Sequence, residues 1–532
     1  MRLFFLGLLS VYSNWMISQN IEFAGNIETN TYWDYDTVWL TGNVVIFENS
    51  VLGIAPGTNI VSKGYYRFDA FGSIVALGNL TDSIVFTVED PTNFSDTSLY
   101  EEGGWDGIHF FPSNLNDSSE FSYCRFSYGK AVSPNNQKGG MFLISNRNNV
   151  SFSNCSFINN LCLESGGALY SNSSNNIFNS LFLLNRSYSY GGGVNFCASN
   201  IEPIVSGCSF IKNIAFRYEI DGVNAWVFGH GSGIYISTSN SPLYMPKIVN
   251  NLFWANMQNP IYESCYNILI ANNLIINNLE GYLNGISIGN QKIINNTFSD
   301  NYGESVYCAN PQLKFYNNII TNCIGSWSTY SGDATNSFVG IADVEYCNIQ
   351  AGNYCQNLGV ISEDSDFINP IPTPDYNVWG NYLHQLETSE MPIFSFEMQD
   401  FDFSLKDESP CVNSGIPNIV GLLLPETDYN GQPRVFGNRI DMGAIENQHV
   451  ISYIPSALAA KYSVFPNPCT NQIFIAGVKT DIPVEIFNVT GSSVLFTEYT
   501  SQGIDLSTLE PGFYTLRFTS NKKTQSIKFV KN

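Results

Sequence analysis

Charged side chains are scarce in this chain: Asp, Glu, Lys and Arg make up only 13% of its 532 residues. Basic residues are the scarcer kind, with 23 Lys and Arg against 46 Asp and Glu, which gives a net charge of -23. The excess acid lies toward the two ends, because residues 121–323 hold ten basic and eight acidic side chains. A chain without a basic stripe lacks the electrostatic footprint that binds phosphate backbones, so we predict no nucleic-acid partner.

Long apolar runs are also lacking. The longest spans residues 3–11, after Arg2, and is followed by a polar stretch that ends near Ser18. A membrane helix needs about 20 apolar residues, whereas one positive charge before a short apolar run is typical of a secretory signal peptide. We therefore predict a signal peptide over residues 1–19, passage through the periplasm and no membrane span in the mature protein.

The spacing of the cysteines argues against a redox motif or a zinc site. None of the 12 cysteines forms a C-x-x-C pair, and their intervals do not fit a zinc site. Three of them share one column of the repeat described below, so most are expected to be small buried core residues. Cys347 and Cys355 are the pair expected to form a local disulfide in an exported protein. No Ser-His-Asp spacing, phosphate loop or nucleotide fingerprint is present, and we predict no cofactor.

What the sequence does contain is a repeat. The stretch "NNTFSDN" at residues 295–301 has near copies in "SNCSFINN", "NSLFLLN" and "NNLFWAN". The unit is 22 or 23 residues long with occasional insertions. Its first column reads Cys124, Cys155, Ser180, Cys208, Asn251, Asn273, Asn296 and Asn318. Two places on stand Phe126, Phe157, Phe182, Phe210, Phe253, Ile275, Phe298 and Ile320. Five places on stand Gly129, Asn160, Asn185, Asn213, Asn256, Asn278, Asn301 and Cys323.

This period predicts a solenoid of short strands. Each unit consists of short Phe, Ile and Val runs separated by Asn, Gly and Ser, without the apolar spacing of three and four that a helical repeat needs. In a parallel β-helix equal positions stack about 4.8 Å apart, so the Phe column fills the interior. Stacked asparagines can hydrogen-bond along the column, and asparagine tolerates the left-handed backbone of a turn.

Several segments resemble known families. The pairing of F-x-x-N with "GGALYS" is similar to the repeat of polymorphic outer membrane proteins over residues 120–325. Upstream, "SVLGIAPGTNIV" and "GGWDGIHF" resemble the opening coils of right-handed parallel β-helix proteins such as pectate lyases. Downstream, "DFDFSLKDESPCVNSGIP" and "IDMGAIE" resemble their terminal segment, which implies that this part closes the solenoid. Its polar residues Asp428, Arg434, Asp441 and Glu446 are interpreted as partners in a cap.

The last 72 residues carry a different pattern. "YSVFPNP", "VEIFNVTGSSVL" and "PGFYTLRF" alternate short strands with Gly and Pro turns, which predicts a small β-sandwich. This part resembles the type A C-terminal sorting domain of the type IX secretion system, which implies that the secretion machinery binds it and that the chain is secreted or attached to the outer surface.

We thus predict an all-β chain: a right-handed parallel β-helix followed by a small C-terminal β-sandwich. The expected parts are a signal peptide at 1–19, an N-terminal cap and first coils at 20–120, regular coils at 121–323, terminal coils and a cap at 324–447, a linker at 448–460 and the sorting domain at 461–532.

The carboxylates needed by β-helix enzymes are sparse. Calcium binding needs clustered carboxylates, but the repeat region holds only two aspartates, Asp221 and Asp300, roughly 14 Å apart at three coil steps. We therefore predict no metal site; calcium is possible but has no support in the sequence. "FGHGSGIYI" has the Gly-His-Gly of polygalacturonases, without that family's paired aspartates or basic motif, and its Gly-Ser-Gly falls in the glycine column of the repeat.

An insertion offers the best candidate site. The interval of 43 residues between Cys208 and Asn251 must push about 20 residues out of the coil. An aromatic ring and carboxylates on a loop held by a rigid scaffold suit sugar recognition, although a solvated loop would have the same composition. The candidate ligand-binding residues are Tyr218, Trp226, Trp254 and Tyr262, and the candidate catalytic residues are Glu219, Asp221 and His230.

Three functions remain open at this stage. We favour a carbohydrate-binding or adhesive surface protein whose partner is an extracellular polysaccharide or surface glycan. A polysaccharide lyase or hydrolase using Glu219, Asp221 and His230 is the alternative. A structural surface spacer would explain the asparagine columns equally well.

Overall fold

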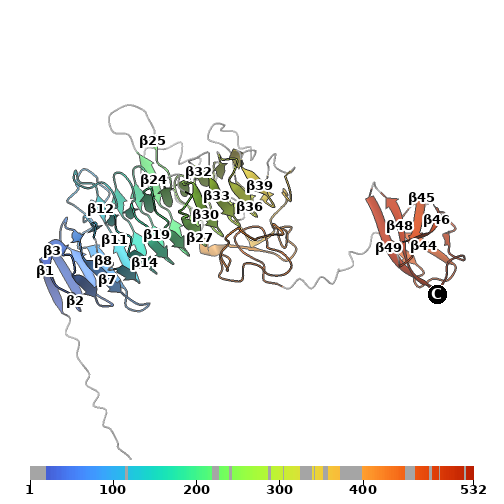
Figure 1. Cartoon of the computed structure of the whole chain (residues 1–532), viewed down its shortest axis with the longest axis horizontal. Helices are drawn as coiled ribbons and strands as arrows, with labels where there is room; N and C mark the ends of the chain where they lie inside the picture. The colour runs from blue at the N-terminus through green and yellow to red at the C-terminus, as the bar shows by residue number, and fades with distance from the viewer. Residues whose placement is uncertain are drawn as a thin grey trace, which may run out of the picture. The chain divides into compact units, whose positions relative to one another are not determined.

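The structure is a computed structural model that describes residues 19–113, 118–217, 227–238, 242–284, 289–303, 305–308, 310–323, 338–340, 342–350, 357–371, 398–449, 462–478, 482–489, 492–520 and 523–532. The chain divides into two compact units, Met1–His449 and Val450–Asn532. Each is built of β-strands (Figure 1).

The first unit is a parallel β-helix, which confirms the predicted fold class. Each coil contributes one short strand to each of three parallel sheets, and successive coils pair strand on strand in register. The first sheet contains β2 (Thr31–Trp33), β4 (Val51–Ile54), β7 (Ser73–Leu77), β10 (Ser119–Ser122), β14 (Val150–Ser153), β18 (Asn176–Phe178), β22 (Ile204–Ser206), β27 (Lys247–Val249), β30 (Asn267–Ala271), β33 (Asn290–Ile294), β36 (Lys314–Tyr316) and β39 (Asp343–Glu345).

The second and third sheets share the first strands of the unit, β1 (Asn20–Ile27) and β3 (Thr37–Ile46). The second sheet continues with β5 (Asn59–Ser62), β8 (Ile84–Val88), β11 (Cys124–Ser127), β15 (Ser156–Ile158), β19 (Leu181–Leu183), β23 (Ser209–Ile211), β28 (Leu252–Trp254), β31 (Leu274–Ile276), β34 (Thr297–Ser299), β37 (Ile319–Thr321) and β40 (Asn348–Ile349). The third continues with β6 (Phe68–Ala70), β9 (Ile108–Phe110), β13 (Phe142–Ile144), β17 (Leu169–Ser171), β21 (Val194–Cys197), β26 (Ile234–Ser237), β29 (Ile261–Ser264), β32 (Tyr282–Asn284), β35 (Val306–Cys308) and β38 (Phe338–Gly340).

Shorter strands complete the two units. Between the second and third sheets lie β12 (Lys130–Ala131), β16 (Leu161–Cys162), β20 (Arg186–Ser187), β24 (Ile214–Arg217) and β25 (Val227–Phe228). The end of the first unit adds β41 (Phe367–Asn369), the 3-10 turn η2 (Met398–Asp400) and β42 (Asp402–Leu405). The second unit has two antiparallel sheets, one of β43 (Ser463–Phe465), β44 (Gln472–Ala476) and β47 (Ile504–Asp505), the other of β46 (Ser493–Tyr499), β45 (Ile482–Phe487), β48 (Gly512–Ser520) and β49 (Lys523–Lys531).

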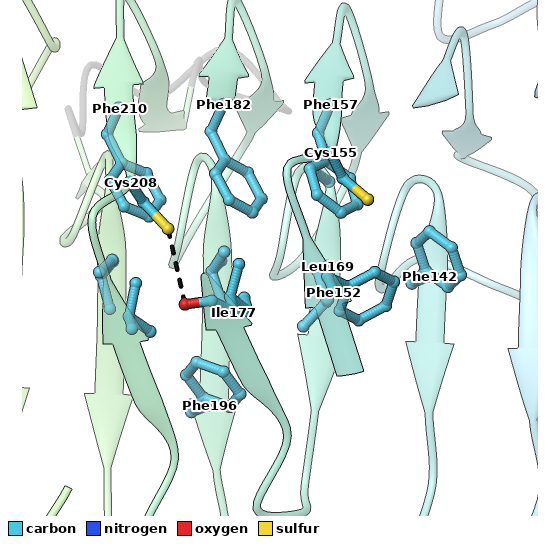
Figure 2. Packing of buried hydrophobic residues seen from close by; sticks show 14 of the residues in the cluster. Phe142, Phe152, Cys155, Phe157, Leu169, Ile177, Phe182, Phe196, Cys208 and Phe210 are labelled. Carbon is cyan, nitrogen blue, oxygen red and sulfur yellow. Dashed lines mark hydrogen bonds between the residues drawn. The ribbon is translucent and has the colours of Figure 1, made fainter. Parts of the chain in front are cut away.

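The predicted Phe column fills the interior of the solenoid. Phe157, Phe182 and Phe210 lie one above another on β15, β19 and β23, with ring centroids 4.4 and 4.7 Å apart (Figure 2). These distances match the spacing between neighbouring strands, about 4.7–4.9 Å. The rings therefore stack because the backbone stacks, and the same residue recurs because it meets the same environment in each coil.

The asparagine columns form the predicted hydrogen-bond ladders. The Asn213 side chain donates to Asn256 Oδ1 at 3.1 Å, and the Asn256 side chain donates to Asn278 Oδ1 at 3.0 Å. Each side-chain oxygen also accepts the backbone N–H of the residue on the preceding rung, as between Asn213 and Asn256 at 3.0 Å. These amides are fully buried, so a satisfied ladder fixes the register of the coils.

One detail of the turns differs from the sequence prediction. The left-handed residue is the one before the ladder position rather than the ladder asparagine itself, as at Asn159 (φ 53°) before Asn160 and Asn277 (φ 53°) before Asn278. The left-handed residue reverses the chain direction, and the next residue can then point its amide into the corner. The two tasks therefore fall on neighbouring residues.

Cysteines replace asparagine on several rungs. The Cys208 thiol donates to the Ile177 carbonyl at 3.6 Å (Figure 2), and the Asn318 N–H reaches the Cys347 sulfur at 3.3 Å. Among the described cysteines all but Cys197 are buried, which confirms their interpretation as core residues. Cys347 is a free, buried thiol, so the expected disulfide with Cys355 is wrong; Cys355 itself lies outside the described residues.

The C-terminal segment of the first unit, residues 398–449, packs on the outside of the second sheet. Outward-facing Leu274, Ile276 and Ile319 are covered by residues such as Phe403 and Met442. The segment therefore lies along the side of the last coils, whereas the family resemblance implied that it closes the end of the solenoid.

A buried polar network holds this segment together. Arg434 donates to Glu446 at 2.6 Å and, through its other terminal nitrogen, to Asn272 at 3.3 Å on the solenoid. Asp441 accepts the Asn413 N–H at 2.6 Å, and Asp428 accepts the Glu446 N–H at 2.9 Å. All four ionisable side chains are buried and paired, which confirms their structural interpretation.

Replacing Asn256 by Ala is expected to destabilise the first unit by about 3 kcal/mol or more, since each buried polar group left without a partner costs about 1–3 kcal/mol. Asn213, Phe210 and Asn278 would all lose a hydrogen bond. Urea unfolding of the whole chain measures the effect, with Asn26→Ala at an exposed position as the control. Equal stabilities of the two variants would contradict the ladder's role.

Asp300 makes stability depend on pH. It is buried in the turn before Asn301, and burial raises its pKa to about 7 despite hydrogen bonds from Ser299 and Asn322. The folded state thus holds this proton more tightly than the unfolded chain, whose carboxyl titrates near pH 3.9. Ionising Asp300 in the folded state therefore costs stability. This cost is absent below about pH 4 and grows as the pH rises to about 7.

Asp300→Asn is therefore expected to stabilise the protein at pH 8 and to leave its stability unchanged near pH 4. Thermal unfolding of both proteins at the two pH values measures the difference. Asp90→Asn is a control of opposite sign, because hydrogen bonds from Thr92 lower the pKa of that exposed carboxyl. A stabilisation by Asp300→Asn that is the same at both pH values would argue against the buried carboxylate as its cause.

Candidate functional site

The outer face of the third sheet carries a cluster of four aromatic rings. Strand β26 alternates buried and half-buried residues, so Tyr235 points outward between Ile234 and Ile236. Tyr262 on β29 pairs with Tyr235 in register and also points outward. The parallel pairing of consecutive coils thus places one tyrosine directly above the other.

The cluster is closely packed. Tyr235 and Tyr262 stack with centroids 4.8 Å apart and planes 3° from parallel. Tyr190 lies 4.7 Å from Tyr235, and His230 lies 5.0 Å from Tyr262 and 6.2 Å from Tyr190. Tyr190 is the most open member, with 40% of its side chain exposed. We call Tyr190, His230, Tyr235 and Tyr262 the ring cluster.

A chain of hydrogen bonds runs from His230 across the next two coils. His230 Nδ1 lies 3.1 Å from Asn259 Oδ1, and the Asn259 side-chain amide donates to the carboxylate of Glu280. Burial lowers the pKa of His230, although its hydrogen bond with Asn259 acts in the opposite direction. Burial likewise raises the pKa of Tyr262. Burial therefore favours the neutral forms of His230 and Tyr262, and the carboxylate of Glu280 lies behind them.

Two of the residues predicted from the sequence meet in this cluster. His230 and Tyr262 are in ring contact, as expected for residues beside the insertion. The insertion leaves the coil at β24 and returns at β25, which pair as antiparallel strands. Tyr218, Glu219, Asp221 and Trp226 lie outside the described residues.

Trp254 does not belong to this surface. It lies on β28 of the second sheet, fully buried beneath the C-terminal segment and 6.5 Å from the Phe401 ring. The prediction of Trp254 as a ligand-binding residue is thus wrong, because a segment far along the chain covers its strand.

The sequence analysis missed Tyr190, Tyr235, Asn259 and Glu280. A signal for Tyr190 was present, since Tyr190 and His230 both precede a glycine of the repeat's glycine column and pair in register. The same alignment would have placed Tyr235 outward on the following strand. Nothing in the sequence spacing pointed to Asn259 or Glu280.

A second polar cluster lies on the third sheet near its start, where Asp69 on β6 pairs in register with His109 on β9. Asp106 is its centre and accepts from Asn136 at 2.9 Å and Arg67 at 3.3 Å, with His109 at 3.7 Å. Burial raises the pKa of Asp106, but His109, Asn136 and Arg67 outweigh this effect and keep it lowered. The carboxylate is therefore ionised and fully engaged within the fold.

Within the part of the chain that the structure describes, no three His, Cys, Asp or Glu side chains are grouped so that they could hold a metal ion. Nor does that part contain a helix with the length and apolar character needed to span a bilayer.

Comparison with known proteins identifies the C-terminal part. Residues 463–532 match the family described as the secretion system C-terminal sorting domain. No curated protein matches the chain. The solved structure of PorZ, an essential bacterial surface component of the type-IX secretion system of Porphyromonas gingivalis, is 21% identical over 14% of this chain, with a TM-score of 0.13, and the match spans only 12% of PorZ.

A second solved structure is similar to a larger share of the chain. Pectate lyase Pel9A is 14% identical, with a TM-score of 0.32, over 74% of this chain and 88% of its own length. Neither likeness carries an argument about activity. The family match confirms the prediction made from "YSVFPNP" and "PGFYTLRF": the chain ends in a sorting domain of the type IX secretion system, which directs it to the cell surface.

Proposed function

We propose that this protein is a glycan-binding protein of the outer cell surface, exported by way of a signal peptide at residues 1–19 and its sorting domain. The ring cluster on the third sheet is the proposed binding surface. The observation that carries this proposal is the exposure of stacked tyrosines beside an insertion on an otherwise regular solenoid. Such a concentration of rings on an outer face is a common mark of a recognition surface.

The chemistry of the cluster suits a sugar. A pyranose has C–H faces that pack against the negative face of an aromatic ring, and hydroxyl groups that need polar partners. Tyr190 offers the most exposed ring. Tyr235 is covered on both sides by Tyr190 and Tyr262, so it offers its phenol edge rather than a ring face. His230 and Asn259 supply polar atoms beside the rings.

Rigidity favours binding at this surface. The four rings pack on one another, and Tyr235 and Tyr262 stand on strands that are paired on both sides. A surface that is ordered before the ligand arrives loses less side-chain entropy on binding. The regular coils on either side offer a long straight face for an extended polymer.

Tyr190→Ala is expected to weaken glycan binding about tenfold or more, since truncating an anchoring aromatic commonly costs 1–2 kcal/mol or more. The test is retention of the whole chain on insoluble cellulose, mannan and cross-linked polygalacturonate, with release of new chain ends followed in parallel. Tyr32→Ala, which removes a ring exposed to 63% on β2 of the first sheet, is the matched control.

The outcomes separate the three functions. Retention that Tyr190→Ala abolishes and Tyr32→Ala preserves supports the proposal. Release of chain ends that Glu219→Ala or Asp221→Ala abolishes would instead make the protein a lyase or hydrolase. Retention on none of the polymers would contradict glycan binding and leave the surface spacer.

A further inference from the structure

The orientation of the Asn259 amide follows from its partners. An ionised carboxylate only accepts hydrogen bonds, so the NH₂ group of Asn259 must face Glu280 and its carbonyl oxygen must face His230. That oxygen can only accept, so the proton of a neutral His230 must be on Nδ1. The Glu280 carboxylate thereby selects one of the two tautomers of His230, two coils away.

This tautomer leaves the Nε2 lone pair available. His230 is half-buried, and within the described part of the chain Nε2 has no hydrogen-bond partner. The rings of Tyr190 and Tyr262 lie nearly parallel to the imidazole, with planes 20° from its own. The carboxylate of Glu280 lies behind Asn259, on the side of that residue away from His230.

We propose that His230 is the hydrogen-bond acceptor of the binding surface, that Asn259 and Glu280 are its positioning residues, and that Nε2 receives a hydroxyl of a neutral polysaccharide. The ligand part of this inference rests on the proposed function. A lone pair recognises a hydroxyl donor, whereas a uronate would bring its carboxylate toward both this lone pair and Glu280. The hydrogen-bonded chain therefore favours neutral glycans over acidic ones.

The tautomer can be measured without any ligand. Nitrogen NMR of the whole chain labelled with ¹⁵N-histidine distinguishes Nδ1–H from Nε2–H, and His230→Gln identifies the His230 signals among the four histidines. We expect the Nδ1–H form in the native protein at pH 8 and its loss in Asn259→Leu. A native Nε2–H signal would overturn the positioning roles of Asn259 and Glu280.

Binding tests the acceptor itself. His230→Phe keeps a ring in the cluster but removes the lone pair, and it should weaken retention on cellulose or mannan about tenfold. Native binding should also weaken as pH falls and His230 is protonated, while His230→Phe should show no such step. The groups that face His230 are Tyr190, Tyr262, Asn259 and, behind Asn259, Glu280.

Failure of this inference is distinguishable from failure of the proposed function. Retention on polygalacturonate alone, or binding to neutral polymers that His230→Phe leaves unchanged, would overturn the acceptor role while glycan binding stands. Retention on no polymer would overturn glycan binding and with it the ligand part of the inference, while the NMR result would still decide the orientation of His230.

Discussion

The rest of this structure depends on the hydrogen bond between equal side chains on neighbouring coils. Along the ladder columns a buried asparagine such as Asn278 donates to the equivalent residue one coil further on and accepts from the coil before. Because side chains alternate inward and outward along a strand, a slip of one residue would turn every apolar side chain outward. A slip of the ladder would also leave its buried amides unpaired. The two penalties act on the same register and reinforce each other.

This constraint explains how the solenoid tolerates an insertion. Asn213 and Asn256 are 43 residues apart in the sequence, yet they are bonded as directly as any other pair on the ladder. The corners before and after the inserted stretch are pinned, so the extra residues leave the coil without disturbing its neighbours. The same in-register pairing of strands orders the ring cluster. It places Tyr235 on Tyr262, as it places Phe182 on Phe210.

Side chains on the outer surface of the solenoid have different neighbours from those in its interior. Interior residues meet their counterparts in adjacent coils, whereas outward residues meet solvent or whatever segment packs on them. The outward side chains of the second sheet are covered by the C-terminal segment of the unit, and Trp254 is buried as a result. On the third sheet the outward tyrosines stay accessible. Outward-facing aromatic residues on neighbouring strands, Trp254 on β28 and Tyr262 on β29, thus serve core packing in one place and the candidate surface in the other.

The sequence by itself determined the solenoid, its Phe core, its asparagine ladders and the sorting domain, because the period of the sequence equals the period of the fold and identical environments select identical residues. It also placed His230 and Tyr262 near one another through the insertion. Only the tertiary structure decided which outward residues are open, since covering segments come from distant parts of the chain. It also joined His230, Asn259 and Glu280, which are separated by unequal intervals of 29 and 21 residues. Hydrogen bonds between side chains at the irregular turns follow no repeat, so no sequence column records them.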